Sequence, residues 1–146
     1  MTAGQALAAL VPHAGRMCLL DEVVSWNETQ VICRSASHRR PDHPLRRDGF
    51  LPAIHLLEYA AQATAVHGGL LAAAGGSPAA AKYLAAAREI SLRVASLDDL
   101  QAELQVDAER LLAMGDGTLY RFRVSTDGRE LATGRLTVVP PAGEPS

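Results

Sequence analysis

The stretch GFLPAIHLLEYAAQATAVHGGLLAAA, from Gly49 to Ala74, is the longest apolar run of the chain. Pro52 stands near its first turn and two glycines follow its last residue, and these are common start and stop signals of an α-helix. One acid, Glu58, lies in the middle of the run, with Gln62 one helical turn later. The stretch therefore predicts a long helix that holds a carboxylate among apolar neighbours.

A membrane-spanning helix is the weaker interpretation of this run. A central acid opposes membrane insertion by roughly 2.5–3.5 kcal/mol, whereas each Leu or Ile favours it by only about 0.3–0.6 kcal/mol. Alanines, glycines and polar residues such as His55 and His67 also dilute the run. We therefore expect a helix buried inside a soluble domain, where small alanine side chains allow a sheet to approach closely.

The composition limits the class of protein further. A length of 146 residues fits one domain with its own core, and a net charge of -2 provides no global attraction for nucleic acid. Cys18 and Cys33 lie in separate apolar runs without metal-ligand spacing, so we expect reduced thiols in a cytoplasmic protein without metal or cofactor. The domain is expected to span residues 1–139, followed by a disordered tail over residues 140–146.

Apolar and alternating runs on both sides of the helix predict β-strands. Alternation of apolar and polar residues indicates an antiparallel sheet with one face in water. The fold class is therefore α+β, with a curved sheet of about six strands wrapped around one long helix. The expected strands cover Arg16–Trp26, Thr29–Ser37, Glu89–Val94, Leu100–Glu109, Leu119–Thr126 and Arg129–Val139.

Glu58 is the first candidate for chemistry, because a carboxylate among apolar residues is paired, protonated or catalytic. Gln62 lies at i+4 and can hydrogen-bond it; we also count Gln62 among the residues that contact a substrate. His43, in the polar loop before the helix, is a candidate general base beside this acid. Arg46 and Arg47 belong to a basic patch in the same loop, which suits an acidic carrier protein or a phosphate, although a solvated loop would look the same.

Three stretches resemble the β-hydroxyacyl-acyl-carrier-protein dehydratases of the hot-dog fold. Val11-Pro12-His13 with Met17 to Asp21 is similar to their N-terminal pattern "PH…MLLLD". His43 to Gln62 is similar to their active-site segment "HFPxxPxMPGVLxxEAxAQ", and the strands from Ala85 to Val139 follow their layout. The sequence of this second segment is most similar to the branch from aryl-polyene pathways, which carries "NPLRxDGxLPAxxxIEYAAQ".

The resemblance implies an active site formed between two protomers whose sheets join. A loop histidine, here His43, would remove the α-proton of a 3-hydroxyacyl thioester, and Glu58 would protonate the departing β-hydroxyl. The N–H of Ala53 would bind the thioester carbonyl at the start of the helix. The implied partners are an acyl-carrier-protein or coenzyme A thioester and a second subunit, identical or related, with neither nucleic acid nor membrane.

One departure from the family pattern leaves three functions open. Counted back from Glu58, the family's histidine position holds Pro44, and His43 stands one residue earlier. Members of the aryl-polyene branch do not keep that histidine. The leading hypothesis is dehydration of 3-hydroxyacyl thioesters to enoyl thioesters. The alternatives are a non-catalytic or half-site partner of a homologous dehydratase, and an acyl thioesterase in which the helix carboxylate activates water.

Overall fold

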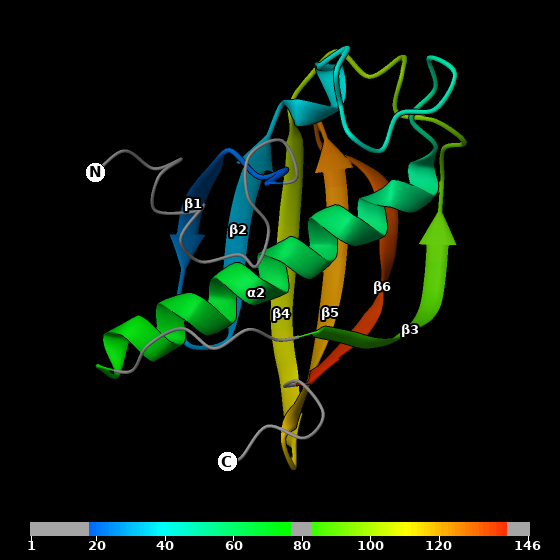
Figure 1. The fold of residues 1–146 in the computed structure, drawn as a ribbon. Helices are drawn as coiled ribbons and strands as arrows, with labels where there is room; N and C mark the ends of the chain where they lie inside the picture. The colour runs from blue at the N-terminus through cyan, green and yellow to red at the C-terminus, as the bar shows by residue number, and fades with distance from the viewer. Residues whose placement is uncertain (1–17, 77–82, 140–146) are drawn as a thin grey trace.

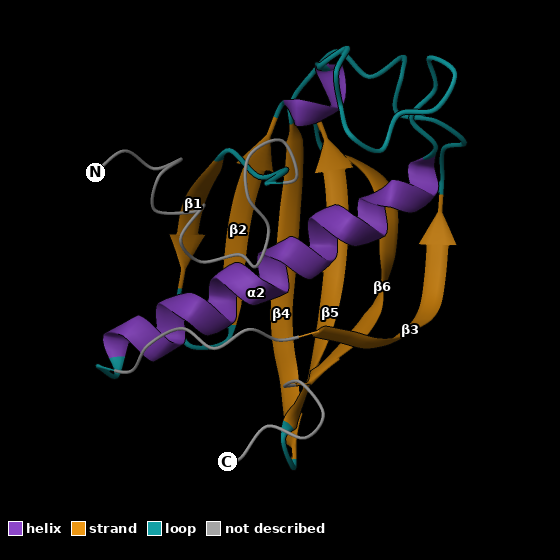
Figure 2. Cartoon of the chain, in the orientation of Figure 1, coloured by secondary structure: helices purple, strands orange, loops and turns teal. Residues whose placement is uncertain are grey.

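A computed structural model describes residues 18–76 and 83–139, in which one long helix packs against a six-stranded antiparallel sheet (Figures 1 and 2). The strand order is β1-β2-β4-β5-β6-β3. The predicted fold class is confirmed. The strands are β1 (Glu22–Trp26), β2 (Gln30–Ser35), β3 (Tyr83–Leu92), β4 (Leu104–Met114), β5 (Gly117–Thr126) and β6 (Arg129–Val139).

The predicted helix is present but begins later than its apolar run. Pro52 is extended, a short 3-10 helix η3 covers Ala53–His55, and the α-helix α2 runs from Leu56 to Ala74. Gly75 ends α2 by donating its N–H to the carbonyl of Leu71 at 3.1 Å. None of the helices in the described ranges is long and apolar enough to cross a membrane. Because α2 begins at Leu56, Glu58 lies in its first turn.

The core lies between α2 and the central strands, and small side chains on the helix allow the close approach. Tyr59, Ala60, Ala63 and Val66 of α2 are all buried. The alternation predicted for the central strands is confirmed by burial of Leu104, Val106, Ala108, Tyr120, Phe122 and Val124. β4 begins at Leu104 rather than Leu100 and continues to Met114, because its pairing with β5 extends to a hairpin there.

The strand predicted at Glu89–Val94 is wrong in its bounds. β3 begins at Tyr83 and ends at Leu92, and its pairing with β6 shifts register between Arg88 and Ser91. Glu89 has a positive φ of 55°, which is typical of a β-bulge. The bulge breaks the simple alternation of this strand, and Leu92 is exposed.

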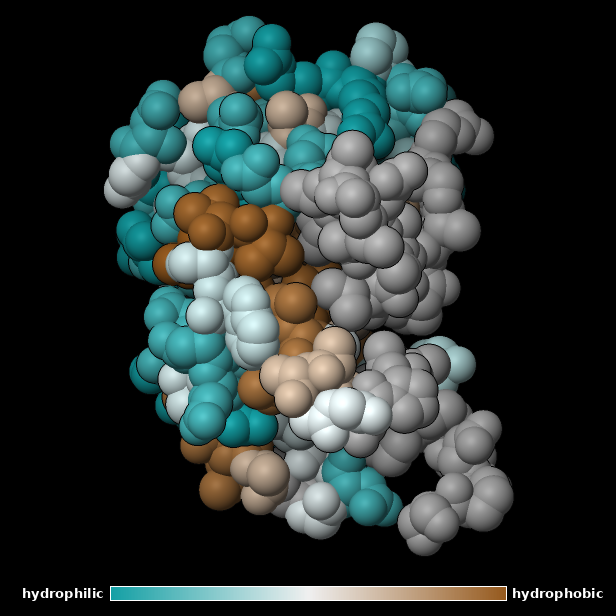
Figure 3. All heavy atoms as spheres, turned by 90° about the vertical axis from the view of Figure 1, so that its left-hand side faces the viewer, coloured by the Kyte–Doolittle hydropathy of each residue, from teal (hydrophilic) through white to brown (hydrophobic). Residues whose placement is uncertain are grey.

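Both end strands of the sheet carry exposed apolar side chains. At one end, Tyr83, Leu84 and Leu92 of β3 are exposed. At the other end, β1 exposes Val24 and Trp26; the face shown in Figure 3 has apolar side chains gathered at its centre. Edge strands of this kind are common sites of association, because their outer backbone groups can pair with another chain.

The start of α2 lies beside the end of β3. Pro52 forms a β-bridge with Ser96, and Ala53 donates its N–H to the carbonyl of Ala95 at 3.0 Å. Two large apolar residues of this corner, Phe50 and Ile54, are 63% and 48% exposed. The predicted N-terminal stretch up to Met17 and the tail over residues 140–146 lie outside the described residues.

Candidate active site

Glu58 is half-buried in the first turn of α2 and is held by the side chain one turn later. The amide nitrogen of Gln62 donates to the Oε1 atom of Glu58 at 3.4 Å, as the i, i+4 spacing predicts. The amide oxygen of Gln62 accepts the backbone N–H of Leu19 at 2.8 Å, and Gln62 is 1% exposed. The buried amide therefore has a fixed orientation and presents its N–H to the carboxylate.

His43 is buried, with 4% of its surface exposed, and both of its ring nitrogens are hydrogen-bonded. Nδ1 accepts the backbone N–H of Leu45 at 3.1 Å, and Nε2 lies 3.1 Å from the hydroxyl of Tyr59. Two successive turns hold its backbone, since His43 N–H donates to Arg40 and its carbonyl accepts from Arg46. Burial, and then the positive charge of Arg46, lower the pKa of His43 to about 4. The imidazole is therefore neutral at pH 7.

The hydroxyl of Tyr59 continues this contact into a buried row of hydroxyl groups. It lies 2.6 Å from Ser37 Oγ, which lies 2.9 Å from Ser35 Oγ, and Ser35 Oγ donates to the carbonyl of Leu19 at 2.5 Å. Ser35 Oγ is the donor toward both the Leu19 carbonyl and Ser37 Oγ. Because Nδ1 of His43 accepts the N–H of Leu45, the neutral ring carries its hydrogen on Nε2 and donates it to the Tyr59 oxygen.

Leu19 joins the two predicted catalytic residues into one network. Its carbonyl accepts from Ser35 at the end of the row that begins at His43, and its N–H donates to Gln62, which holds Glu58. The structure thus places His43 and Glu58 at opposite ends of one series of hydrogen bonds.

The predicted substrate-binding arginines form contacts within the loop. The guanidinium of Arg46 donates to the carbonyls of His38 at 2.9 Å and Gly49 at 3.1 Å, and forms an ion pair with Asp98. Asp98 also accepts the N–H of Leu51 at 3.1 Å, and hydrogen bonds from Ser96 and Leu51 lower the pKa of its carboxyl. Arg46 therefore ties the loop to the residues that precede the helix.

Arg47 and Ala53 also have internal partners. Arg47 is exposed and donates to the carbonyls of Pro44 at 3.2 Å and Arg46 at 3.0 Å. The N–H of Ala53, which the resemblance assigns to a thioester carbonyl, donates to Ala95. A substrate carbonyl would have to compete with that main-chain oxygen for the hydrogen.

Sequence reasoning assigned no part of the site to Tyr59, Ser35, Ser37 or the backbone of Leu19. Tyr59 offered a usable signal, because a tyrosine beside apolar helix residues needs a partner for its hydroxyl when it is buried. The serines offered none. Their partners lie 16 and 22 residues away in the chain, so only the fold brings them together.

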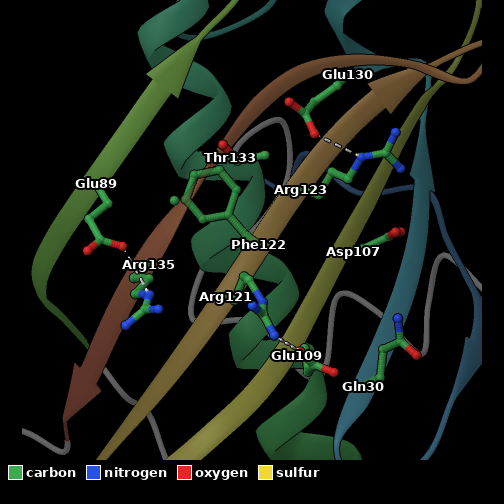
Figure 4. A pocket seen from close by; sticks show the side chains of 11 residues that line it. Gln30, Glu89, Asp107, Glu109, Arg121, Phe122, Arg123, Glu130, Thr133 and Arg135 are labelled. Carbon is green, nitrogen blue, oxygen red and sulfur yellow. Dashed lines mark hydrogen bonds and ion pairs between the residues drawn. The ribbon is translucent and has the colours of Figure 1, made fainter.

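A separate cleft of about 500 Å³ lies on the outer face of the sheet, away from α2 (Figure 4). Its charged side chains pair across neighbouring strands, as a solvated sheet face does. The pairs are Arg121–Glu109 at 2.7 Å, Arg135–Glu89 at 3.1 Å and Arg123–Glu130 at 3.3 Å. A second cleft, of about 570 Å³, lies at the loop beside Arg39 and Arg46.

The long helix, its supported carboxylate and the six-stranded antiparallel sheet define a hot-dog-fold protein with a candidate acid site. The chain belongs to the ApeP-like family, described as ApeP dehydratase, whose family model matches residues 5–146. Among curated proteins, none matches this chain.

Solved structures support the same assignment. A chain of the dehydratase heterocomplex ApeI:P from Xenorhabdus doucetiae is 25% identical with a TM-score of 0.82, covering 94% of this chain and 91% of that one. A hypothetical thioesterase with coenzyme A from Streptococcus pneumoniae has a TM-score of 0.59 at 13% identity, over 82% and 84% of the two chains. AziG from S. sahachiroi has a TM-score of 0.59 at 14% identity, over 90% and 97%. The last two likenesses concern the fold alone.

Proposed function

We propose that this chain is one subunit of a dehydratase that converts 3-hydroxyacyl thioesters to enoyl thioesters, in aryl-polyene or fatty-acid-like biosynthesis. The observation that carries the proposal is Glu58, half-buried at the start of α2 and held by Gln62, in a chain of the ApeP-like dehydratase family. A carboxyl group in this position is suited to general acid catalysis.

The proposed reaction needs one proton acceptor and one proton donor. A general base accepts the α-proton, the electron pair of the broken C–H bond forms the double bond, and the β-hydroxyl departs. Glu58 gives its proton to this hydroxyl, so that water leaves and an enoyl thioester remains. The roles of Gln62, Arg46, Arg47 and the Ala53 N–H as substrate contacts remain part of the proposal.

We further propose that the working form contains a second hot-dog subunit, related or identical. The support is the end strand β3 with its exposed Tyr83, Leu84 and Leu92, next to Phe50 and Ile54 at the start of α2. Such an edge can be covered by the sheet of another protomer. The structurally similar dehydratase ApeI:P is a heterocomplex, which favours a related partner.

The substrate carrier is proposed to be an acyl carrier protein, with coenzyme A as the alternative. The exposed Arg39 and Arg47 would face an acidic carrier or the phosphate of its prosthetic arm. We propose a cytoplasmic location, because Cys18 and Cys33 are both free thiols, as in proteins of reducing compartments.

Product analysis tests the proposed reaction. The chain is purified alone and together with the related dehydratase-like protein from neighbouring genes, and each sample receives a carrier-linked 3-hydroxyacyl thioester. We expect enoyl thioester from the combined sample, detected by mass spectrometry as a loss of water. Release of free thiol without enoyl product would indicate a thioesterase instead. Absence of turnover with every carrier-linked substrate would contradict the proposal.

A further inference from the structure

We infer that His43 is a positioning residue, which fixes the first turn of α2 through Tyr59, rather than the group that accepts the substrate proton. This inference rests on the proposed dehydratase function. Its observation is the pair of contacts made by the buried imidazole, whose Nδ1 accepts the N–H of Leu45 and whose Nε2 lies 3.1 Å from the hydroxyl of Tyr59.

The contact with Leu45 determines the tautomer of His43. A backbone N–H can only donate, so Nδ1 is the unprotonated nitrogen of the neutral ring. His43 therefore carries its hydrogen on Nε2 and donates it to Tyr59. Its remaining lone pair lies on Nδ1, where it accepts the N–H of Leu45 at 3.1 Å. A proton from a substrate would have to displace that backbone contact.

The surroundings of His43 oppose the charge that a general base acquires. The charged and titratable side chains that act on the imidazole are Arg46, His55, Arg40 and His38, each of which is positive when charged. They belong to the loop, to η2 (Ser37–Arg39) and to η3. His43 is also only 4% exposed, and burial withholds solvation from an imidazolium.

The same contacts show what His43 holds in place. Tyr59 follows Glu58 directly in α2 and is fully buried, so its hydroxyl contact fixes the rotation of the first helical turn. The N–H of Leu45 ties the following residue of the loop to the imidazole. His43 thereby sets the direction in which Glu58 faces.

Two variants separate positioning from proton transfer. His43→Gln retains an N–H donor at the end of its side chain but cannot accept a proton near neutral pH. Tyr59→Phe keeps the ring in the core and removes only the hydroxyl. If His43 positions the helix, both variants should lose a similar, moderate factor, about tenfold or less. In His43→Gln, the fall of kcat/KM at acidic pH should occur at the same pH as in the wild type, because no titrating base is removed.

A general base would give a different pattern. Removing such a group lowers turnover by about 10²–10⁴-fold, so His43→Gln would be inactive while Tyr59→Phe remained close to wild type. That pattern, or loss of the fall at acidic pH in His43→Gln, would overturn the inference. Activity is measured on the complex with the related subunit, and thermal unfolding of each variant checks that it folds.

Nuclear magnetic resonance of the unmodified chain tests the inference without any turnover. With 15N-labelled histidine, His43 should show a protonated Nε2 and an unprotonated Nδ1 at pH 7, with both signals unchanged down to pH 5. A protonated Nδ1, or titration near the ordinary histidine pKa, would overturn it. Wild-type turnover tests the dehydratase proposal separately, so failure of one is not mistaken for failure of the other.

Discussion

The side-chain oxygen of Gln62 accepts the backbone N–H of Leu19 at 2.8 Å, linking two residues 43 positions apart in the chain. This contact leaves the amide nitrogen of Gln62 directed at Glu58. One buried side chain therefore anchors the residues before β1 and orients the candidate acid.

Replacing Gln62 by Leu should weaken both the fold and the site. The N–H of Leu19 would lose its partner in a buried position, which destabilises the protein by about 1–3 kcal/mol. Urea unfolding measures this loss, and turnover of the complex should fall as Glu58 loses its support. Gln101→Leu is the matched control, since Gln101 is exposed. Equal stability of the two variants would contradict the role of the contact.

Stability should fall as the pH is lowered from about 6.5 toward 4. Burial lowers the pKa of His43 from 6.5 to about 4 and also lowers the pKa values of His38 and His67. The unfolded chain then binds protons that the folded chain does not, so acid favours unfolding in this window. For His43 the difference is about 2 kcal/mol at pH 5.

Urea unfolding at pH 7 and pH 5 measures this dependence. His43→Gln is the control, because it removes the contribution of this imidazole and should reduce the difference between the two pH values. Identical unfolding midpoints of the wild type at pH 7 and pH 5 would show that the histidines are not held neutral by the fold.

Two glycine-to-alanine substitutions should have opposite effects. At Gly134 in β6 an added Cβ would lie 2.4 Å from Ile90 Cδ1 and 2.8 Å from Phe122 Cε2, so Gly134→Ala should destabilise by about 1–3 kcal/mol. At Gly68 in α2 it would meet no atom within 4 Å, and Gly68→Ala should stabilise by up to about 1 kcal/mol. Thermal unfolding compares the two. A stable Gly134→Ala variant would mean that Phe122 and Ile90 can move apart.

A charge on the end strand β3 should block association with the second subunit. Leu84 is 44% exposed there, and Leu84→Lys would place an ammonium group at the proposed contact. Co-purification with the related subunit should fall at least tenfold. Leu112→Lys is the control, because Leu112 is 52% exposed but lies on β4. Equal recovery of both variants would place the interface elsewhere.

The sequence was sufficient for the fold because its signals were local. The apolar run of α2 and the alternation in β4, β5 and β6 each lie within one element, and burial follows them closely. β3 was misplaced because a bulge at Glu89 changes which residues face the core, and a bulge depends on pairing with another strand.

The candidate site was predictable only in part, for a related reason. The Glu58–Gln62 contact is one helical turn long and follows from spacing. The contacts of His43 with Tyr59, and of Ser35 with Leu19, join different elements, so no spacing rule indicates them. For the same reason, no spacing rule indicates the contacts of Arg46 with loop carbonyls and Asp98, and its predicted contact with substrate stays a prediction.

The most direct test of the central claim is turnover of a carrier-linked 3-hydroxyacyl thioester by the complex that carries Glu58→Gln in this chain alone. Gln has nearly the same shape as Glu but cannot donate a catalytic proton. If Glu58 is the general acid, enoyl thioester formation should fall by about 10²-fold or more while the complex still assembles. If the assembled Glu58→Gln complex turned over substrate at the wild-type rate, the account would be contradicted.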